Sequence, residues 1–361
     1  MVPSPLRVVF VPASGPTGSG EYYRALNLSR ALRRIAPGLE THVLRARSAG
    51  VLDDEGLQVH PLDATPARAD RAVRERLTAL RPALAVFDGS GRTAQLRTVR
   101  RLGGRVAWIS NRPGRRRRAL AWRRLRWIDL HLMLVAEPDR ARLGRFERLR
   151  AGRVPAAEQR FVGAIAPPAG ALPDPLAARI AAQAAVFVSG GGGQVCADGT
   201  PVPDLFVAAA ARYHAATGRP ACVVLGPQYA GTPSAPSGVV LIDALPPEQL
   251  GALLAGAGLV VAGAGNMLSN QVVLAGRPCV MTATGGHDQP RRLAAYAARG
   301  AVQAAPLSAT ALADAAIALS EDAAARRALI DGLARLGLRN DTERVAGWLA
   351  DLAGARQDGR P

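Results

Sequence analysis

The 361-residue sequence contains no lysine, so all 46 of its basic side chains are arginine. Schiff-base enzymes and proteins with a Walker-type phosphate loop both need a lysine amine, and both classes are therefore excluded. Aromatic residues are also scarce, at 4% of the chain, which leaves few rings to stack nucleic-acid bases. The hydrophobic content of 48% must come mainly from Ala, Val and Leu.

Long apolar runs and cysteine pairs are missing as well. No run approaches the roughly 20 apolar residues of a membrane span, and Val8–Val11 is too short for the hydrophobic region of a signal peptide. Cys196, Cys222 and Cys279 are isolated and odd in number, which argues against a disulfide framework and a zinc knuckle. We expect a cytoplasmic protein without a metal site, in which the cysteines are small core residues.

The length and hydrophobic content are sufficient for two α/β domains. Each half alternates strands and helices, which predicts a doubly wound parallel sheet whose ligands lie beyond the carboxyl ends of the strands. The predicted division is residues 1–163, a Pro- and Gly-rich linker at 164–176, residues 177–345, and a C-terminal helix with a loose tail at 346–361. The predicted strands are Arg7–Val11, Thr41–Arg45, Leu84–Asp88, Val106–Ser110, Val186–Ser189, Ala221–Leu225, Val239–Ile242, Leu259–Ala262 and Cys279–Thr282, with early helices near 22–35, 66–80 and 92–101.

The strand Leu259–Ala262 leads through a glycine loop into a helix start, which is the most informative feature of the chain. The first amides of a helix lack intrahelical partners and carry the positive end of the helix dipole, so they suit a diphosphate. Gly263 and Gly265 permit close backbone approach. Polar side chains in the first turns add neutral donors, namely Asn266, Ser269 and Asn270.

At this loop the chain resembles the GT-B glycosyltransferases of the MurG type, which make lipid II, and their sugar-nucleotide-using relatives. That family reads Gly-x-x-x-x-x-Glu-x-x-x-x-Gly-x-Pro and continues to a loop that ends in Asp-Gln or His-Gln. Gly265, Gly276 and Pro278 match these positions, and Asp288 with Gln289 ends the loop. The resemblance implies two doubly wound Rossmann-like domains facing across a cleft, in a bacterial sugar-transferring enzyme.

Two positions near this loop depart from the family pattern. Gln271 stands at the place of the ribose-binding Glu, where it can accept a hydroxyl hydrogen bond but lacks the charge. Gly263 stands where the family has an Arg. Two further segments fit the resemblance, namely Phe161-Val-Gly163 and the glycine loop after residue 189. The predicted donor site comprises Gly190, Gly191, Gly192, Gly193, Ile242, Gly265, Asn266, Ser269, Asn270, Gln271, His287, Asp288 and Gln289.

The first domain is expected to bind the acceptor and to supply the base. Its first loop carries Thr17, Gly18, Ser19 and Gly20, and Glu21 takes the place of the family's loop His. Glu21 and Asp88 are the candidate bases for the acceptor hydroxyl, provided that burial raises the pKa of the carboxyl. The alternatives are that Glu21 caps the following helix and that Asp88 is a turn residue. His42, His60, His131 and His214 are interpreted as surface residues.

Arginines gather around two tryptophans between Arg115 and Trp127. A helix of this composition could contact an anionic membrane at its inner face or an acceptor phosphate, or it could be a solvated helix whose apolar residues pack in the core. Nucleic acid is disfavoured because no recognition module is visible.

The resulting prediction is an inverting, metal-independent glycosyltransferase of hexosyl or N-acetylhexosaminyl groups. It needs no cofactor beyond a nucleoside-diphosphate sugar, with UDP expected, and its acceptor is a small or lipid-linked molecule. The alternatives are a sugar-nucleotide hydrolase, a 2-epimerase, and a catalytically silent sugar-nucleotide binding protein.

Overall fold

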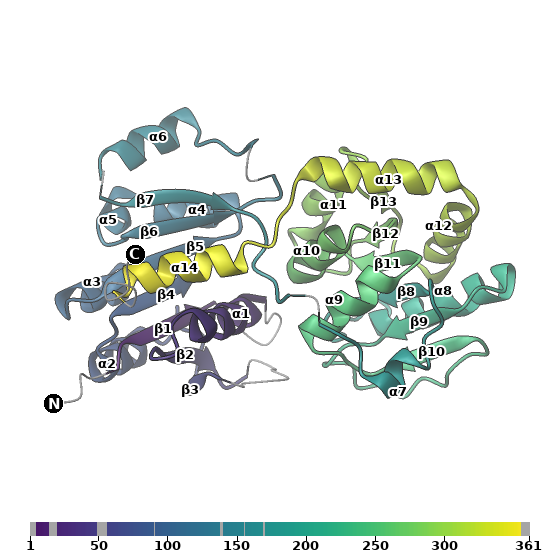
Figure 1. Cartoon of the computed structure of the whole chain (residues 1–361), viewed down its shortest axis with the longest axis horizontal. Coiled ribbons are helices and arrows are strands. Elements are labelled where there is room, and N and C mark those ends of the chain that lie inside the picture. Colours follow the sequence, from purple (N-terminus) through teal and green to yellow (C-terminus); the bar gives the residue numbers. More distant parts are fainter. Residues whose placement is uncertain are drawn as a thin grey trace. The chain divides into compact units, whose positions relative to one another are not determined.

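The computed structural model describes residues 5–13, 20–48, 56–89, 91–137, 140–154, 156–168 and 170–354. The chain forms two compact units (Figure 1). The first contains Met1–Ile165 together with Arg339–Pro361, and the second contains Ala166–Leu338. No helix among the described residues is long and apolar enough to cross a membrane.

The first unit is built on a parallel sheet of seven strands in the order β3-β2-β1-β4-β5-β6-β7. The order reverses direction between β1 and β4, so the carboxyl ends of these two strands lie at the switch point where such sheets bind ligands. The strands are β1 (Arg7–Pro12), β2 (Glu40–Ala46), β3 (Gln58–Leu62), β4 (Leu84–Asp88), β5 (Arg105–Ser110), β6 (Leu130–Leu134) and β7 (Glu158–Val162).

Both faces of this sheet are covered, which explains the continuous apolar run of β1. Val8 and Phe10 pack on one face against the cluster that includes Leu26, whereas Val9 and Val11 pack on the opposite face. The helices of this unit are α1 (Gly20–Ile35), α2 (Asp70–Leu80), α3 (Thr93–Arg101), α4 (Pro113–Ala119), α5 (Trp122–Leu125), α6 (Arg145–Gly152) and α14 (Thr342–Leu352).

The chain returns to the first unit at its C-terminal end. The segment around Ala164 pairs with the segment around Asn340, and Gly163 donates its backbone N–H to Oδ2 of Asp341 at 2.6 Å. Helix α14 then packs against α1, where Val345 and Leu349 join the same core cluster as Leu26 (Figure 1). Residues 339–345, assigned from sequence to the second domain, therefore make their contacts in the first unit.

The second unit is built on a parallel sheet of six strands in the order β10-β9-β8-β11-β12-β13. Its switch point lies between β8 and β11. The strands are β8 (Ala185–Val188), β9 (Ala221–Val224), β10 (Val239–Ile242), β11 (Leu259–Gly263), β12 (Cys279–Thr282) and β13 (Gln303–Ala304). The helices are α7 (Asp174–Ala177), α8 (Val202–Thr217), α9 (Pro247–Gly256), α10 (Asn266–Ala275), α11 (Gln289–Ala297), α12 (Ala309–Glu321) and α13 (Ala323–Leu336).

The predicted strands are all present with boundaries shifted by one or two residues at most, and the two doubly wound parallel sheets are confirmed. The sequence analysis did not include β3, β6, β7 and β13. Strands β3 and β7 are edge strands with several polar residues, and β3 contains Pro61, so their apolar pattern is weak. Strand β13 has only two residues.

The sequence suggested a single arginine-rich helix, and this prediction is wrong. The segment forms two short helices, α4 and α5, with Leu120 and Ala121 between them. Leu120 and Leu125 are fully buried, whereas Trp122 is 53% exposed. The alternative in which the apolar residues of this segment pack in the core therefore holds for the two leucines but not for Trp122.

Candidate functional site

The two glycine loops of the second unit flank the switch point of its sheet. One follows β8 and the other follows β11, and these strands are hydrogen-bonded neighbours. A Cβ added at Gly263 would lie 2.1 Å from the carbonyl oxygen of Ser189, so only glycine permits this approach. The sequence placed both loops correctly at the carboxyl ends of their strands, and the tertiary structure brings them into contact.

The first loop, Gly190 to Gly193, packs against the loop that follows β9. Gln228 donates its backbone N–H to the carbonyl oxygen of Gly191 at 2.9 Å. Gly192 has φ +86° and a Cβ there would lie 2.6 Å from the Leu225 carbonyl oxygen, so this glycine faces the supporting loop. Gly191 and Gly193 are exposed and remain available to a ligand. Ile242, expected beside the base of the donor, ends β10 and is 7% exposed.

Helix α10 begins after a glycine, which has no side chain to cap the first amides. Gly265 is the N-cap residue and offers no side-chain acceptor. Asn266 and Asn270 are partly exposed on the first turns. Ser269 was expected to bind the donor, but it is fully buried and its hydroxyl lies 3.9 Å from Sδ of Met281. The available donors at this helix start are therefore the backbone amides and the two asparagines.

Gln271 is buried and joins α10 to α9. Its Nε2 donates to the carbonyl oxygen of Pro247 at 2.7 Å, which fixes the orientation of the amide. Its Oε1 accepts no hydrogen bond from the described residues. A fixed amide with an open carbonyl oxygen can accept one hydroxyl hydrogen bond, as the sequence suggested.

Side chains in and next to the loop between β12 and α11 form hydrogen bonds and an ion pair with one another. Oε1 of Gln289 accepts hydrogen bonds from the backbone N–H and the hydroxyl of Thr284, at 2.6 and 3.1 Å. Asp288 forms an ion pair with Arg292. His287 is exposed and has no hydrogen-bond partner among the described residues. Of these three predicted donor-site residues, only His287 makes no side-chain hydrogen bond or ion pair within the described residues.

Arg292 is a site residue that the sequence analysis missed. Its Nη1 donates to the carbonyl oxygen of Ala264 at 2.6 Å, inside the glycine loop that precedes α10. Its side chain is 14% exposed and also pairs with Asp288. The family's Arg is absent at position 263, but this guanidinium reaches the same loop from α11. The only sequence signal is the spacing of four residues between Asp288 and Arg292 on a helix.

Two buried polar atoms at this edge have no hydrogen-bond partner among the described residues. They are Oγ of Ser189, at the end of β8, and Oε1 of Gln194 in the following loop. Buried polar groups without a partner are rare in folded proteins and are costly. Their position beside the glycine loops is consistent with groups that a ligand would satisfy.

The first unit places Glu21 and Asp88 around one buried arginine at its own switch point. Arg24 donates from Nε to Oδ2 of Asp88 at 2.8 Å and from Nη2 to Oδ1 at 3.0 Å. Its Nη2 also lies 3.7 Å from Oε1 of Glu21. Arg115 donates to the same Glu21 oxygen at 2.6 Å, so two carboxylates and two guanidiniums form a continuous network.

Burial and charge affect the two carboxyl groups differently. Burial tends to raise the pKa of Glu21, but the nearby guanidiniums of Arg24 and Arg115 outweigh it and hold this pKa below its usual range. Burial also raises the pKa of Asp88, and for this side chain the Arg24 guanidinium does not fully offset the effect. Asp88 is 3% exposed, so the structure keeps its carboxylate away from solvent. Glu21 is the more accessible of the two, with a side chain 13% exposed.

Glu21 lies in the first turn of α1, and Gly20 is the first residue of that helix. The alternative that Glu21 caps the helix from outside does not hold, but a carboxylate in the first turn of a helix interacts favourably with the helix dipole. Of the expected acceptor-side loop, Thr17, Gly18 and Ser19 lie outside the described residues.

The prediction that His42 and His131 lie on the surface is wrong. His42 is 2% exposed and His131 is fully buried. His131 lies 2.9 Å from Oγ of Ser110 through Nε2 and 2.9 Å from Oε1 of Gln159 through Nδ1. Burial lowers the pKa of His131 to about 4, so it is neutral at physiological pH. This burial could not be predicted from the sequence, because a histidine within a five-residue strand can face either side of a sheet.

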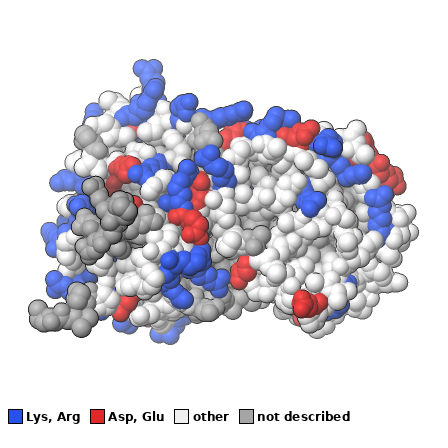
Figure 2. Space-filling model, in the orientation of Figure 1, with Lys and Arg blue, Asp and Glu red and all other residues white. Residues whose placement is uncertain are grey.

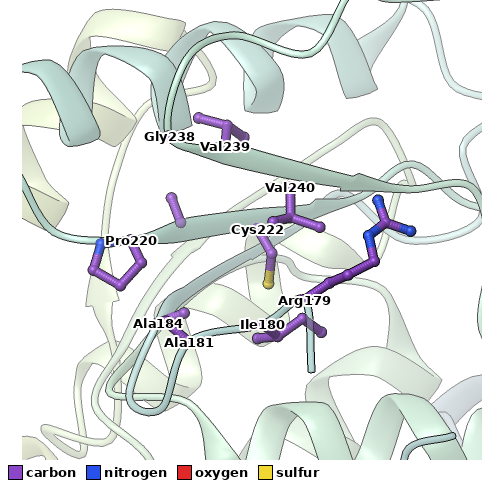
Figure 3. Close-up of a pocket in the computed structure, with 10 residues that line it drawn as sticks. Arg179, Ile180, Ala181, Ala184, Pro220, Cys222, Gly238, Val239 and Val240 are labelled. Carbon is purple, nitrogen blue, oxygen red and sulfur yellow. The ribbon is translucent and has the colours of Figure 1, made fainter. Parts of the chain in front are cut away.

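A cavity of about 340 Å³ lies at the opposite edge of the second sheet (Figure 3). It is lined by residues at the amino ends of β9 and β10, including Cys222 and Val240, and by Arg179. Burial raises the pKa of the Cys222 thiol to about 12, so this cysteine is not a reactive nucleophile. Parallel sheets bind their ligands at the carboxyl edge, and we therefore do not assign the donor to this cavity.

No protein-family model and no curated protein matches the sequence. Solved structures do match. The spinosyn forosaminyltransferase SpnP is 16% identical and aligns with a TM-score of 0.67 over 97% of this chain and 100% of its own. The glycosyltransferase SnogD from Streptomyces nogalater is 20% identical, with a TM-score of 0.66 over 97% and 99% of the two chains. MurG from Acinetobacter baumannii is 16% identical, with a TM-score of 0.60 over 96% and 100%. The two parallel α/β units of this chain thus have the GT-B fold of these glycosyltransferases.

Proposed function

We propose that this protein is a glycosyltransferase that moves a sugar from a nucleoside diphosphate to an acceptor hydroxyl. The observation that carries the proposal is the convergence of two glycine loops, a helix start with a glycine N-cap and a guanidinium at the switch point of the second sheet. These groups supply backbone donors, dipole and positive charge in one place, which is what a diphosphate requires. The fold shared with sugar-transferring enzymes supports the same function.

A pyrimidine nucleotide is the proposed donor, and UDP is preferred from the MurG-type resemblance of the sequence. Two solved structures of similar fold are complexes of this kind, one with UDP-2-fluoro-glucose and one with dTDP. In this chain the open Oε1 of Gln271 would accept a ribose hydroxyl. The leaving diphosphate would be stabilised by the α10 amides and by Arg292, so the proposed reaction needs no metal.

Glu21 is the proposed base. An acceptor hydroxyl becomes strongly acidic as its oxygen bonds to an oxocarbenium-like carbon, so its proton can pass late in the step to a weakly basic carboxylate. The raised pKa expected from the sequence is wrong for Glu21, because two arginines hold its pKa below the usual range. Glu21 is therefore ionised but weakly basic, and it would take the proton only late in the step. Asp88, buried and bound by both of its oxygens to Arg24, would fix the arginine that orients Glu21.

Incubation with UDP- and dTDP-sugars tests the function directly. Release of the nucleoside diphosphate only when an acceptor is present would support transfer. Release without acceptor would indicate the hydrolase, interconversion of the free sugar would indicate the epimerase, and binding without turnover would indicate the silent binding protein. No binding of any activated sugar or free nucleotide would overturn the proposal.

Replacing Arg292 with Met is expected to weaken donor binding by about 10- to 100-fold, the usual effect of losing a hydrogen bond to a charged group. Arg292→Lys should retain part of the affinity, since it keeps the charge but loses the second donor. Calorimetry with UDP measures the change. Arg291, the exposed neighbour on the same helix, provides the matched control as Arg291→Met. Equal affinities of the two Met variants for UDP would show that Arg292 does not bind the donor.

The pH profile offers a separate test of the base. A carboxyl with a lowered pKa stays ionised as the pH falls, so kcat/KM should be level from neutral pH down to the usual glutamate pKa of about 4.3. It should decline only below that value. A decline centred near pH 6.5, about where an unperturbed histidine titrates, would contradict the assignment.

A further inference from the structure

The cavity of about 340 Å³ at the amino ends of β9 and β10, here called the β9–β10 cavity, lies on an incompletely covered part of the second sheet. On the α8 side of the sheet, Ala221 and Val239 belong to a packed core cluster. Successive strand residues face opposite sides, so Cys222 and Val240 face the other side. There the cover comes from residues 179–184, and no helix contributes a described lining residue. A parallel sheet normally has both faces covered, so this apolar region lacks part of its usual cover.

The side chains around the β9–β10 cavity are small or aliphatic apart from one arginine. Figure 3 shows the sulfur of Cys222 directed toward Ile180. A second cavity of about 150 Å³ adjoins the first, and Ile180, Ala181 and Ala184 line both. No aromatic ring is present among the described residues that line either cavity. The two adjoining spaces therefore suit an aliphatic chain better than a stacked ring.

Arg179 supplies the only charge among the described residues that line this cavity. In Figure 3 its side chain extends toward the side of the cavity that Val240 lines. The side chain is exposed, and it forms no hydrogen bond or ion pair within the described part of the chain. Ten of the 46 arginines lie in the second unit. Figure 2 agrees, because the region where Figure 1 labels β8 to β13 is mostly uncharged in this view. The guanidinium beside the cavity is therefore not one of many on an arginine-rich surface.

We propose that the β9–β10 cavity binds a medium-chain aliphatic carboxylate. The chain would lie between Cys222, Val240 and the alanines, and its carboxylate would pair with Arg179 at the exposed end. Burial of the chain removes apolar surface of both ligand and protein from water, and the guanidinium selects an anionic head group. This inference does not depend on the proposed sugar transfer, whose donor groups lie at the carboxyl ends of β8 and β11.

Calorimetry of the full chain with octanoate and decanoate tests the site. Octanoate is expected to bind, and decanoate should bind about tenfold more tightly because two further methylenes are buried. Two variants fill the cavity from opposite sides, namely Cys222→Met from the strand and Ala181→Phe from the covering segment. Each should weaken octanoate binding by at least about tenfold, because the new side chain occupies the space of the ligand. Ala181 is exposed, so Ala181→Phe should unfold at the temperature of the wild type.

The neutral probe 1-octanol tests the head group. Arg179→Met should lower the ratio of octanoate affinity to 1-octanol affinity about fivefold, the upper range for one exposed ion pair. Arg327 on α13 is also exposed, and Arg327→Met should leave this ratio unchanged. Equal ratios in the wild type and Arg179→Met would overturn the assignment of a carboxylate ligand. The absence of heat with every probe, or an unchanged octanoate affinity in both cavity-filling variants, would overturn the site itself.

Discussion

Replacing Glu21 with Gln is expected to lower kcat by about two to four orders of magnitude, the usual contribution of a general base. The amide is nearly isosteric with the carboxylate and can still accept a hydrogen bond from Arg115, but it cannot take a proton at neutral pH. Donor affinity should change little, because the proposed donor groups all lie in the second unit. Steady-state kinetics with a saturating donor and calorimetry with UDP separate the two effects.

Glu147 provides a closely matched control for this experiment. Its side chain is 14% exposed, compared with 13% for Glu21, and it too accepts a hydrogen bond from an arginine, at 2.8 Å. Glu147→Gln should therefore reproduce the loss of an arginine pair without changing turnover. If Glu21→Gln turned over at the wild-type rate, or if both variants lost activity equally, Glu21 would not be the base.

Replacing Arg24 with Met is expected to lower the free energy of unfolding by about 3–5 kcal/mol, the usual cost of removing one member of a buried ion pair. The Arg24 and Asp88 side chains are 1% and 4% exposed, so the variant leaves a carboxylate in the interior without its counter-charge. Urea unfolding measures the loss. Arg34→Met removes an arginine that pairs with Glu343 at an exposed site, and it should cost only about 0–1 kcal/mol.

A double variant and the pH dependence distinguish two causes of this loss of stability, namely an unpaired buried charge and lost packing. Arg24→Met with Asp88→Asn should be more stable than Arg24→Met alone, because no charge is then left in the interior. Without Arg24 the pKa of Asp88 should rise further, and an acid whose folded-state pKa is raised favours the folded state at low pH. The difference from the wild type should therefore shrink as the pH falls toward the usual aspartate pKa of about 3.9. A penalty independent of pH and of Asp88→Asn would show that packing alone was lost.

The sequence by itself determined most strands, the division into two α/β units and the two glycine loops. These features depend on short-range patterns, namely continuous apolar runs for buried strands and glycines at the strand ends, and such patterns can be read without knowing what packs against them. The sequence does not show what a glycine makes room for: Gly263, expected to admit a diphosphate, lies against the carbonyl oxygen of Ser189.

The tertiary structure alone decided which side chains meet. Arg24 and Asp88 are 64 residues apart, and Arg292 reaches Ala264 across 28 residues. Sheet order places their segments side by side, and no local pattern encodes that order. Side-chain direction was decided in the same way, because Ser269 and His131 face the interior. Tertiary contact also shifts the pKa of Glu21, since the guanidinium of Arg115, 94 residues away in the sequence, joins that of Arg24 on the same helix in lowering it.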